Sequence, residues 1–349
     1  MTADRIHTIA IIGAGAWGTA LARLIAHQGY AVRLWAYEPD VAHTINASRE
    51  NSFYLKGVSL PSSLYATSRL DEAVHGAQAL ILASPSHVFH TLLLQLAPSL
   101  PSPMPIVIAT KGIEDESLRL MSDVVDALLP SYWHSWLLVL SGPSFAAEVS
   151  QDKPTTVLLA GRNAQLVEQL QQLLMTPTFR IYGGTDLIGA QIGGALKNVM
   201  AIASGIVDGL QLGFNARAAL ITRGLAEMIR LGSAMGAHVA TLYGLSGLGD
   251  LVLTCTGPLS RNYTVGFQLG CGASLDRILA ETHTVAEGIR TTRAAVGLAR
   301  RYGIDMPIVQ SVYDVLFNGR NPRDAVSQLM TRAARSELDP VLARPSADH

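Results

Sequence analysis

The chain has 349 residues, of which 49% are hydrophobic and 15% are charged, and its 26 Lys and Arg against 27 Asp and Glu give a net charge of −1. The length exceeds the roughly 250 to 300 residues at which a single core stops growing, and the composition is too hydrophobic for a disordered chain, so we expect two domains. The balanced charge gives no electrostatic reason to expect nucleic acid or an anionic membrane as the main partner, because both require a concentrated basic surface.

Cysteine and histidine spacing argues against disulfides and metals. Cys255 and Cys271 form no CxxC pattern, and only His87 and His90 of the ten histidines are close in sequence, so we predict neither a disulfide framework nor a metal site. The first apolar run begins near Ile6, which leaves no room for a signal peptide and favours a cytoplasmic location.

The pattern of the first 36 residues predicts a βαβ unit. A β-branched run at residues 6–12 stops at Gly13, a helical pattern follows at 16–28, and a second strand covers 30–36. Such a unit requires a parallel sheet buried on both faces. Further short apolar runs, separated by helix-length segments, predict a doubly wound parallel-sheet α/β domain; they lie at residues 79–83, 106–109, 136–140, 155–160 and 178–182.

Strand patterns cease after Gly184, and glycine-interrupted helical patterns follow. We therefore predict an α/β domain at residues 1–184, an all-α domain at 185–336 and a disordered tail at 337–349. Residues 187–207 are apolar enough to suggest a membrane span, but they contain a lysine, an asparagine and several glycines. We predict a buried helix there and no stable membrane insertion.

The glycine pattern between the first strand and the first helix predicts dinucleotide binding. Residues 13–18 read Gly-Ala-Gly-Ala-Trp-Gly, a G-x-G-x-x-G sequence in its proper context. Gly13 permits the tight turn, Gly15 lets the backbone approach a pyrophosphate, and Gly18 lets helix and strand pack closely. At the end of the second strand, Glu38 is either a partner for the adenosine ribose or a solvated residue of the next helix, so NAD and NADP both remain open.

Lys197 is a candidate general acid and base. Its neighbours at helical spacing are Gly193, Gly194, Met200 and Ala201, a poor environment for a solvated lysine. Burial disfavours the ammonium and lowers its pKa, which would allow proton exchange near neutrality. The alternatives are a lysine that reaches solvent from a helix end or one that pairs with a single buried acid.

Two strand ends carry polar groups at the carboxyl edge of the predicted sheet, where open α/β folds bind ligands. Lys111 follows the strand at 106–109, and its ammonium is expected to point into the cleft. Gly142, Pro143 and Ser144 follow the strand at 136–140, with Pro143 suited to the first position of a helix that runs to about Val149. Both segments are otherwise ordinary β-to-α turns.

Polar groups in the helical region suggest phosphate binding. Asp250 and Ser260 have the residue types of helix N-caps, while Arg261, flanked by Ser260 and Asn262 at a helix start, suits a phosphate group. Cys255 has no nearby base in sequence, which predicts a structural thiol.

Together these motifs resemble bacterial NAD(P)-dependent glycerol-3-phosphate dehydrogenases over about residues 6–335. The resemblance implies reversible reduction of dihydroxyacetone phosphate to sn-glycerol 3-phosphate by NAD(P)H for phospholipid biosynthesis. It also implies a homodimer in which a Rossmann domain precedes an all-α substrate-binding and dimerisation domain like that of 6-phosphogluconate dehydrogenase. The matching segments begin at Gly13, Ala109, Ser141, Gly193, Asn215, Gly247, Ser260 and Val285.

The same resemblance implies residue roles, with Lys197 as proton donor and acceptor. The implied substrate ligands are Lys111, Gly142, Ser144, Lys197, Asp250, Ser260, Arg261 and Asn262. The implied cofactor contacts are Gly13, Gly15, Ala16, Trp17, Gly18, Tyr37, Lys111, Ala146, Arg261, Val285 and Glu287. The ligands come from both predicted domains, which suggests that substrate binding is accompanied by domain closure.

Three sites depart from the commonest family pattern. Ala16 stands where serine is frequent, which removes a hydroxyl able to bond the pyrophosphate, and Lys56 stands where proline is usual. The third departure is Gly257-Pro258, which precedes Leu259.

Two other functions are alternatives to this assignment. The first is a β-hydroxyacid dehydrogenase, which has asparagines three and four positions after its lysine, where this chain has Met200 and Ala201. The second is a non-catalytic redox sensor that binds the dinucleotide, which would not need Lys197, Asp250 and Arg261 together.

Overall fold

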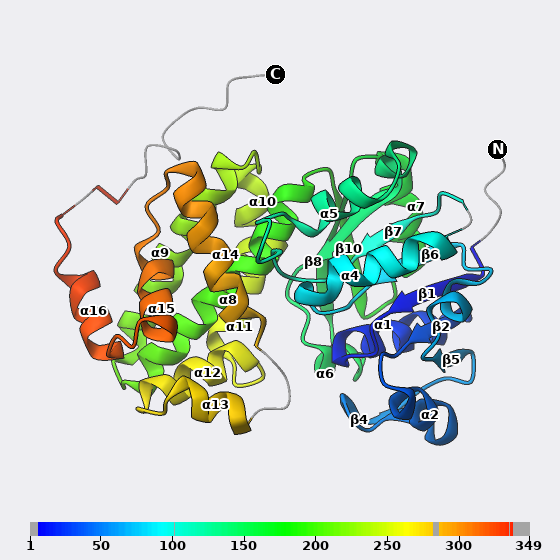
Figure 1. The fold of residues 1–349 in the computed structure, drawn as a ribbon, viewed down its shortest axis with the longest axis horizontal. Helices are drawn as coiled ribbons and strands as arrows, with labels where there is room; N and C mark the ends of the chain where they lie inside the picture. The colour runs from blue at the N-terminus through cyan, green and yellow to red at the C-terminus, as the bar shows by residue number, and fades with distance from the viewer. Residues whose placement is uncertain (1–5, 101, 282–285, 335, 338–349) are drawn as a thin grey trace. The chain divides into compact units, whose positions relative to one another are not determined.

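The computed structural model describes residues 6–100, 102–281, 286–334 and 336–337 (Figure 1). The chain forms two compact units. The first contains the residues up to Lys111 together with Met121–Leu187, and the second contains Gly112–Leu120 together with the residues from Ile188 onward.

An eight-stranded sheet forms the centre of the first unit, with the order β10-β9-β8-β7-β6-β1-β2-β5. All seven predicted strands are present, and β5 is an additional edge strand that was not predicted. The strands are β1 (Thr8–Ile12), β2 (Ala31–Trp35), β5 (Leu64–Thr67), β6 (Ala79–Leu82), β7 (Ile106–Ile108), β8 (Leu137–Ser141), β9 (Thr155–Gly161) and β10 (Phe179–Gly184).

The sheet is parallel except between β8 and β9, which pair antiparallel with Val139 opposite Ala160. The predicted parallel sheet is therefore confirmed except at this pair. The segment between these strands contains only the single-turn helix α6 (Ala146–Val149) and lacks a crossover helix that would return the chain to the same end of the sheet. β10 is parallel to β9, so two strands run against the others.

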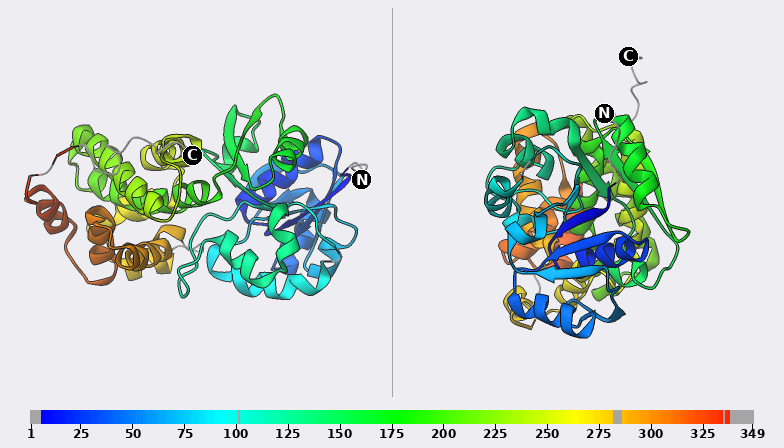
Figure 2. Two further views of the ribbon diagram at one scale, coloured as in Figure 1. Left: turned by 90° about the horizontal axis from the view of Figure 1, so that it is seen from above. Right: turned by 90° about the vertical axis from the view of Figure 1, so that its right-hand side faces the viewer.

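Helices cover both faces of this sheet, with α1 and α7 on one side and α4 and α5 on the other (Figure 2). The strands are consequently buried on both faces, as the continuous apolar runs of β1 and β6 require. A small hairpin, β3 (Glu50–Asn51) with β4 (Leu55–Ser59), follows α2. The helices are α1 (Ala16–His27), α2 (Pro39–Ser48), α3 (Leu70–Val74), α4 (Ser86–Leu96), α5 (Met121–Leu128) and α7 (Ala164–Leu174), with 3₁₀ turns at Ala97–Ser99 and Ser131–Trp136.

The second unit is built from helices around α8 (Leu187–Gly209). The predicted buried helix is confirmed, since an 18-residue apolar window of α8 is entirely buried. The stretch 239–256 is also long and apolar enough to cross a membrane by composition, and 39% of it is buried. The other helices are α9 (Gly213–Ala234), α10 (Val239–Tyr243), the π turn Leu245–Gly249, α11 (Asp250–Thr256), α12 (Arg261–Gly270), α13 (Leu275–Glu281), α14 (Glu287–Tyr302), α15 (Pro307–Phe317) and α16 (Pro322–Met330).

Glycines on α8 explain how neighbouring backbones pack against it. A Cβ added at Gly193 would lie 2.3 Å from the carbonyl oxygen of Ser246, and one added at Gly205 would lie 2.1 Å from that of Tyr263. Only glycine permits such close approach. The π turn and α12 therefore lie directly against α8.

The segment Gly112–Leu120 belongs to the helical unit, which a single boundary near residue 184 does not anticipate. Ile113 and Leu120 form an isolated antiparallel bridge, and both are buried in the core of the second unit. Leu118 packs so closely on α14 that a Cβ at Gly297 would lie 2.8 Å from it. The predicted disordered tail lies almost entirely outside the described residues.

Candidate active site

The glycine loop between β1 and α1 fits a dinucleotide pyrophosphate. Gly13 has a φ of +120°, and a Cβ there would lie 2.8 Å from the backbone of Ala83. A Cβ at Gly18 would lie 1.9 Å from the Gly13 carbonyl oxygen, whereas one at Gly15 would meet no atom within 4 Å. The first and third glycines are thus required by packing, and the second leaves open space beside the loop.

The N-terminus of α1 offers donors to a ligand at this loop. Gly15 occupies the N-cap position, and no side chain caps this helix among the described residues. The first-turn N–H groups carry the positive end of the helix dipole and suit an anion. In addition, Trp17 Nε1 is a buried donor for which the described residues offer no acceptor. The loop and this indole therefore fit the cofactor.

The end of β2 carries Glu38 at the position expected for the adenosine ribose. Glu38 is the N-cap residue of α2, but its side chain makes no capping bond and instead accepts a hydrogen bond of 2.9 Å from the Tyr54 hydroxyl. Burial, followed by this bond to a carboxylate, raises the pKa of Tyr54 above its usual value. Tyr37 is 77% exposed and stands edge-on to Trp35.

Three predicted substrate residues of the first unit lie together. Lys111 Nζ donates to the carbonyl oxygen of Gly142 at 3.0 Å, and Ser144 Oγ donates to the same oxygen at 2.9 Å. Gly142 has a φ of +142°, which favours glycine, and a Cβ added there would lie 3.0 Å from the Cα atom of Val157. The strand ends therefore assemble as expected for the carboxyl edge of the sheet.

The helix predicted to begin at Pro143 begins later. Pro143 and Ser144 remain in the loop, Phe145 is the N-cap residue, and α6 starts at the half-buried Ala146. The local Ser144–Gly142 hydrogen bond competes with helical pairing and holds the chain in a turn. This prediction was therefore wrong in its boundary.

A buried ion pair is the central feature of the second unit. The Lys197 side chain is 8% exposed and that of Asp250 is 0% exposed. Lys197 Nζ donates to Asp250 Oδ1 at 2.5 Å and to Thr254 Oγ1 at 3.0 Å. Of the interpretations given for Lys197 from the sequence, pairing with a single buried acid is therefore observed.

Asp250 does not cap a helix, contrary to one of the two interpretations of the sequence. It is the first residue of α11, whose N-cap position is occupied by Gly249 of the π turn, and its carboxylate is used by Lys197. Thr254, four residues further along α11, was missed. Its spacing from Asp250 on one helix face was the available signal.

The phosphate candidates lie at the start of α12. Ser260 is confirmed as an N-cap, because its Oγ accepts from the Tyr263 N–H at 3.2 Å. Arg261 is exposed. Asn262 Nδ2 donates to Asn198 Oδ1 at 2.9 Å, and Asn262 Oδ1 accepts from the Gly288 N–H at 2.9 Å.

Through these two hydrogen bonds, Asn262 contacts Asn198 and Gly288, each of which directly follows another predicted site residue. Asn198 follows Lys197 on α8, and Gly288 follows Glu287 at the start of α14. Glu287 is half-buried there, while Val285 lies outside the described residues. Asn198 was not predicted as a site residue, and its hydrogen bond to Asn262 spans 64 residues.

Cys255 is a structural thiol, as predicted. It is fully buried in the core of the second unit, and burial raises its pKa to about 12, so the nucleophilic thiolate is disfavoured at neutral pH.

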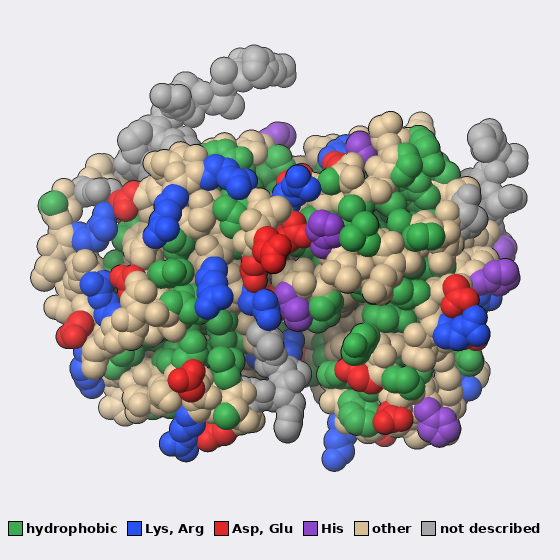
Figure 3. All heavy atoms as spheres, in the orientation of Figure 1, with side chains coloured by type: hydrophobic (Ala, Val, Ile, Leu, Met, Phe, Trp, Pro, Cys, Tyr) green, Lys and Arg blue, Asp and Glu red, His purple; other side chains and the backbone are tan. Residues whose placement is uncertain are grey.

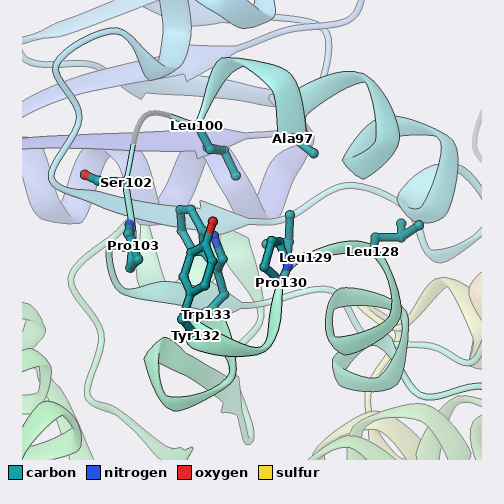
Figure 4. Close-up of a pocket in the computed structure, with 9 residues that line it drawn as sticks. All are labelled: Ala97, Leu100, Ser102, Pro103, Leu128, Leu129, Pro130, Tyr132 and Trp133. Atoms are coloured by element: carbon teal, nitrogen blue, oxygen red, sulfur yellow. The ribbon is translucent and has the colours of Figure 1, made fainter.

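A hollow of about 380 Å³ in the first unit is lined by none of the predicted site residues (Figure 4). None of its lining side chains is a carboxylate, amine, imidazole or guanidinium, so the hollow carries no charged group. The lining residues are Ala97, Leu100, Ser102, Pro103, Leu128, Leu129, Pro130, Tyr132 and Trp133.

The fold and these groups define a class of enzyme. A βαβ glycine loop that fits a pyrophosphate, joined in one chain to an all-helical unit with a buried Lys-Asp pair, is typical of two-domain nicotinamide-dependent dehydrogenases. The chain belongs to the NAD-dependent glycerol-3-phosphate dehydrogenase family. The family's N-terminal profile matches residues 8–167, and its C-terminal profile matches residues 186–327.

Known relatives agree with this assignment over almost the whole chain. The NAD(P)+ glycerol-3-phosphate dehydrogenase of Geobacter metallireducens is 52% identical over 329 residues, covering 94% of this chain and 98% of the relative. The crystal structure of glycerol-3-phosphate dehydrogenase from Coxiella burnetii is 40% identical, with a TM-score of 0.90, and the match covers 94% of this chain and 99% of that one. The resemblance found in the sequence is confirmed.

More distant structures share the architecture. The Saccharomyces cerevisiae glycerol-3-phosphate dehydrogenase is 26% identical with a TM-score of 0.80, covering 93% of this chain and 99% of that one. A D-mandelate dehydrogenase is 15% identical with a TM-score of 0.59, which shows a common fold alone. The family match therefore decides against the alternatives of a β-hydroxyacid dehydrogenase and a non-catalytic sensor.

Proposed function

We propose that this chain reduces dihydroxyacetone phosphate reversibly to sn-glycerol 3-phosphate, with Lys197 as the residue that exchanges the proton at the C2 oxygen. Membership of the family supports both the reaction and the use of NAD(P)H. The observation that carries the role of Lys197 is its burial between Asp250 and Thr254. NAD(P)H supplies the hydride when bound.

The cofactor is assigned to the first unit. The glycine loop holds the pyrophosphate, the Trp17 indole donates to it, and Glu38 or Tyr37 contacts the adenosine end. These roles are supported by the open space at Gly15 and by the uncapped helix α1. The remaining cofactor contacts implied by the family resemblance are Ala16, Lys111, Ala146, Arg261, Val285 and Glu287.

The proton step is assigned to the second unit. In the direction of reduction, Lys197 donates a proton to the oxygen on which negative charge develops, and in oxidation it accepts that proton. Asp250 and Thr254 hold Nζ at 2.5 and 3.0 Å, so the lysine need not reorganise before the transfer. An ammonium that stays paired to a buried carboxylate also avoids an isolated charge in the core.

The remaining substrate contacts are assigned by charge. The exposed guanidinium of Arg261 suits bidentate binding of a phosphate, with Ser260 and Asn262 beside it on the same helix start. Lys111, with Gly142 and Ser144, is assigned to the polar groups of the substrate.

The deciding assay is oxidation of NADH and of NADPH, followed by absorbance, with dihydroxyacetone phosphate and separately with unphosphorylated dihydroxyacetone. Turnover that requires the phosphorylated ketone supports the assignment, and the two cofactor rates establish the preference. Binding of cofactor without turnover on either ketone would contradict it.

The proposal extends to the cellular setting, where we place the enzyme in the cytoplasm as a homodimer without a nucleic-acid partner. On the face drawn in Figure 3, Lys and Arg side chains are scattered among acidic, polar and hydrophobic ones, which disfavours polyanion binding. Sedimentation equilibrium of the purified protein tests the dimer, and a monomer mass at micromolar concentration would exclude it.

A further inference from the structure

Asn51, in the β3–β4 hairpin, has an environment that none of the functions above uses. It is fully buried, and its side chain reaches the glycine loop. Asn51 Nδ2 donates to the carbonyl oxygen of Ala14 at 2.8 Å and to Thr19 Oγ1 at 2.8 Å. Thr19, also fully buried, donates its own hydroxyl to the Ala14 carbonyl at 3.2 Å.

These contacts determine the orientation of one peptide group in the loop. The peptide between Ala14 and Gly15 is planar and trans, so its C=O and N–H point in opposite directions. Because Asn51 and Thr19 hold the carbonyl on their own side, the Gly15 N–H must point away from them. Glycine has a wide range of backbone conformations, so without this restraint the peptide can turn its carbonyl dipole toward an anion.

We infer that Asn51 is a positioning residue for the cofactor: through the Ala14 carbonyl it aims the Gly15 N–H at the dinucleotide pyrophosphate. This inference rests on the proposed placement of the pyrophosphate at the glycine loop. Thr19 acts with Asn51 on the same oxygen.

The chemistry of asparagine suits this position. An amide provides two N–H donors and an acceptor without a net charge, and all three functions are used, because Asn51 Oδ1 accepts from the Tyr54 N–H at 3.2 Å. A buried carboxylate of the same shape offers no donor and adds negative charge near a bound diphosphate. Tyr54 in turn bonds Glu38, so the hairpin contacts both expected ends of the nucleotide site.

The test compares ligands with and without a diphosphate on the full-length protein. Dissociation constants are measured for NADH and ADP, and for adenosine by competition with NADH, in Asn51→Ala, Thr19→Val and Thr19→Ser. We expect Asn51→Ala to raise the Kd of NADH and of ADP by about five- to tenfold, since it removes a buried hydrogen bond. Thr19→Val should raise both about two- to fivefold, Thr19→Ser should match the wild type, and the Kd of adenosine should not change.

Asn46 offers a matched control. Its amide also makes two hydrogen bonds, to the backbone of Ala66 in β5 at 2.7 and 2.9 Å, but none to the glycine loop. Asn46→Ala should lower the melting temperature while leaving the Kd of all three ligands unchanged. The kcat of Asn51→Ala at saturating NADH should stay within about twofold of the wild type, because positioning acts on binding.

Two results would overturn the inference: an unchanged Kd for NADH in Asn51→Ala, or an equal loss for adenosine and ADP. If Asn51→Ala does not fold, Thr19→Val decides in the same way, with an unchanged Kd for the diphosphate ligands counting against it. Failure of the wild type to turn over dihydroxyacetone phosphate would contradict the proposed function instead, because the binding measurements do not depend on that reaction.

Discussion

Glu227 on α9 makes the stability of the helical unit depend on pH. Its side chain is 1% exposed, and its carboxylate accepts the N–H groups of Ile308 at 2.7 Å and Val309 at 3.2 Å at the start of α15. Burial raises the pKa of Glu227 from 4.5 to about 7, and repulsion from Asp305 adds to this effect. The two hydrogen bonds and the charge of Arg230 act in the opposite direction but are outweighed.

A raised pKa means that the folded state binds the proton more tightly than the unfolded state. The free energy of unfolding contributed by Glu227 is therefore largest below pH 4.5 and falls as the pH rises toward 7, after which it is constant. For these two pKa values the loss between pH 5 and pH 8 is roughly 2.5 kcal/mol.

Glu227→Gln keeps the shape and one acceptor but cannot ionise. Urea unfolding of both proteins at pH 5 and pH 8 should show the variant gaining roughly 2.5 kcal/mol relative to the wild type at the higher pH. Far-ultraviolet circular dichroism is the suitable probe, because all four tryptophans lie in the first unit. Glu281→Gln, which changes an exposed acid that pairs with Arg277 on α13, is the control for removing a carboxylate and should show no such difference. If the difference in free energy of unfolding between the wild type and Glu227→Gln is the same at both pH values, the reasoning is refuted.

Three other predictions concern the site and the packing behind it. Lys197→Met should lower kcat by about 10²- to 10⁴-fold and leave the Kd of NADH unchanged, and near-normal turnover would remove this lysine from the proton step. Arg261→Ala should raise the KM for dihydroxyacetone phosphate by roughly tenfold or more in steady-state assays, and an unaltered KM would place the phosphate elsewhere. Gly205→Ala should lower the melting temperature strongly, because the added Cβ would lie 2.1 Å from the Tyr263 carbonyl oxygen; calorimetry showing a wild-type value would mean that α12 can move aside.

The amino-acid sequence alone was sufficient for the elements whose causes are local. The β-branched run before Gly13, the helical pattern after it and the second strand predict β1, α1 and β2 within one or two residues. Glycine next to an apolar helix face likewise predicted that α8 is buried around Lys197, because only close packing explains small residues there. The family resemblance also depended on sequence alone.

Tertiary structure decided which distant groups meet. The spacing of residues did not show that Asp250 pairs with Lys197, 53 residues away, nor that Gly249 takes the N-cap position that Asp250 was expected to fill. Asn51 reaches Ala14 across 37 residues, and Glu227 reaches Ile308 across 81. Such contacts follow from the way helices and strands pack, and no local pattern of hydrophobic and polar residues records their partners.

The antiparallel β9 and the segment Gly112–Leu120 have the same explanation. An apolar strand has the same residue pattern whichever way it runs, so only the connection and its neighbours set its direction. Ile113 and Leu120 are apolar residues that either core could bury, and their packing in the helical unit decided between them. Periodicity predicts that a side chain is buried, whereas the choice of core depends on the three-dimensional surroundings.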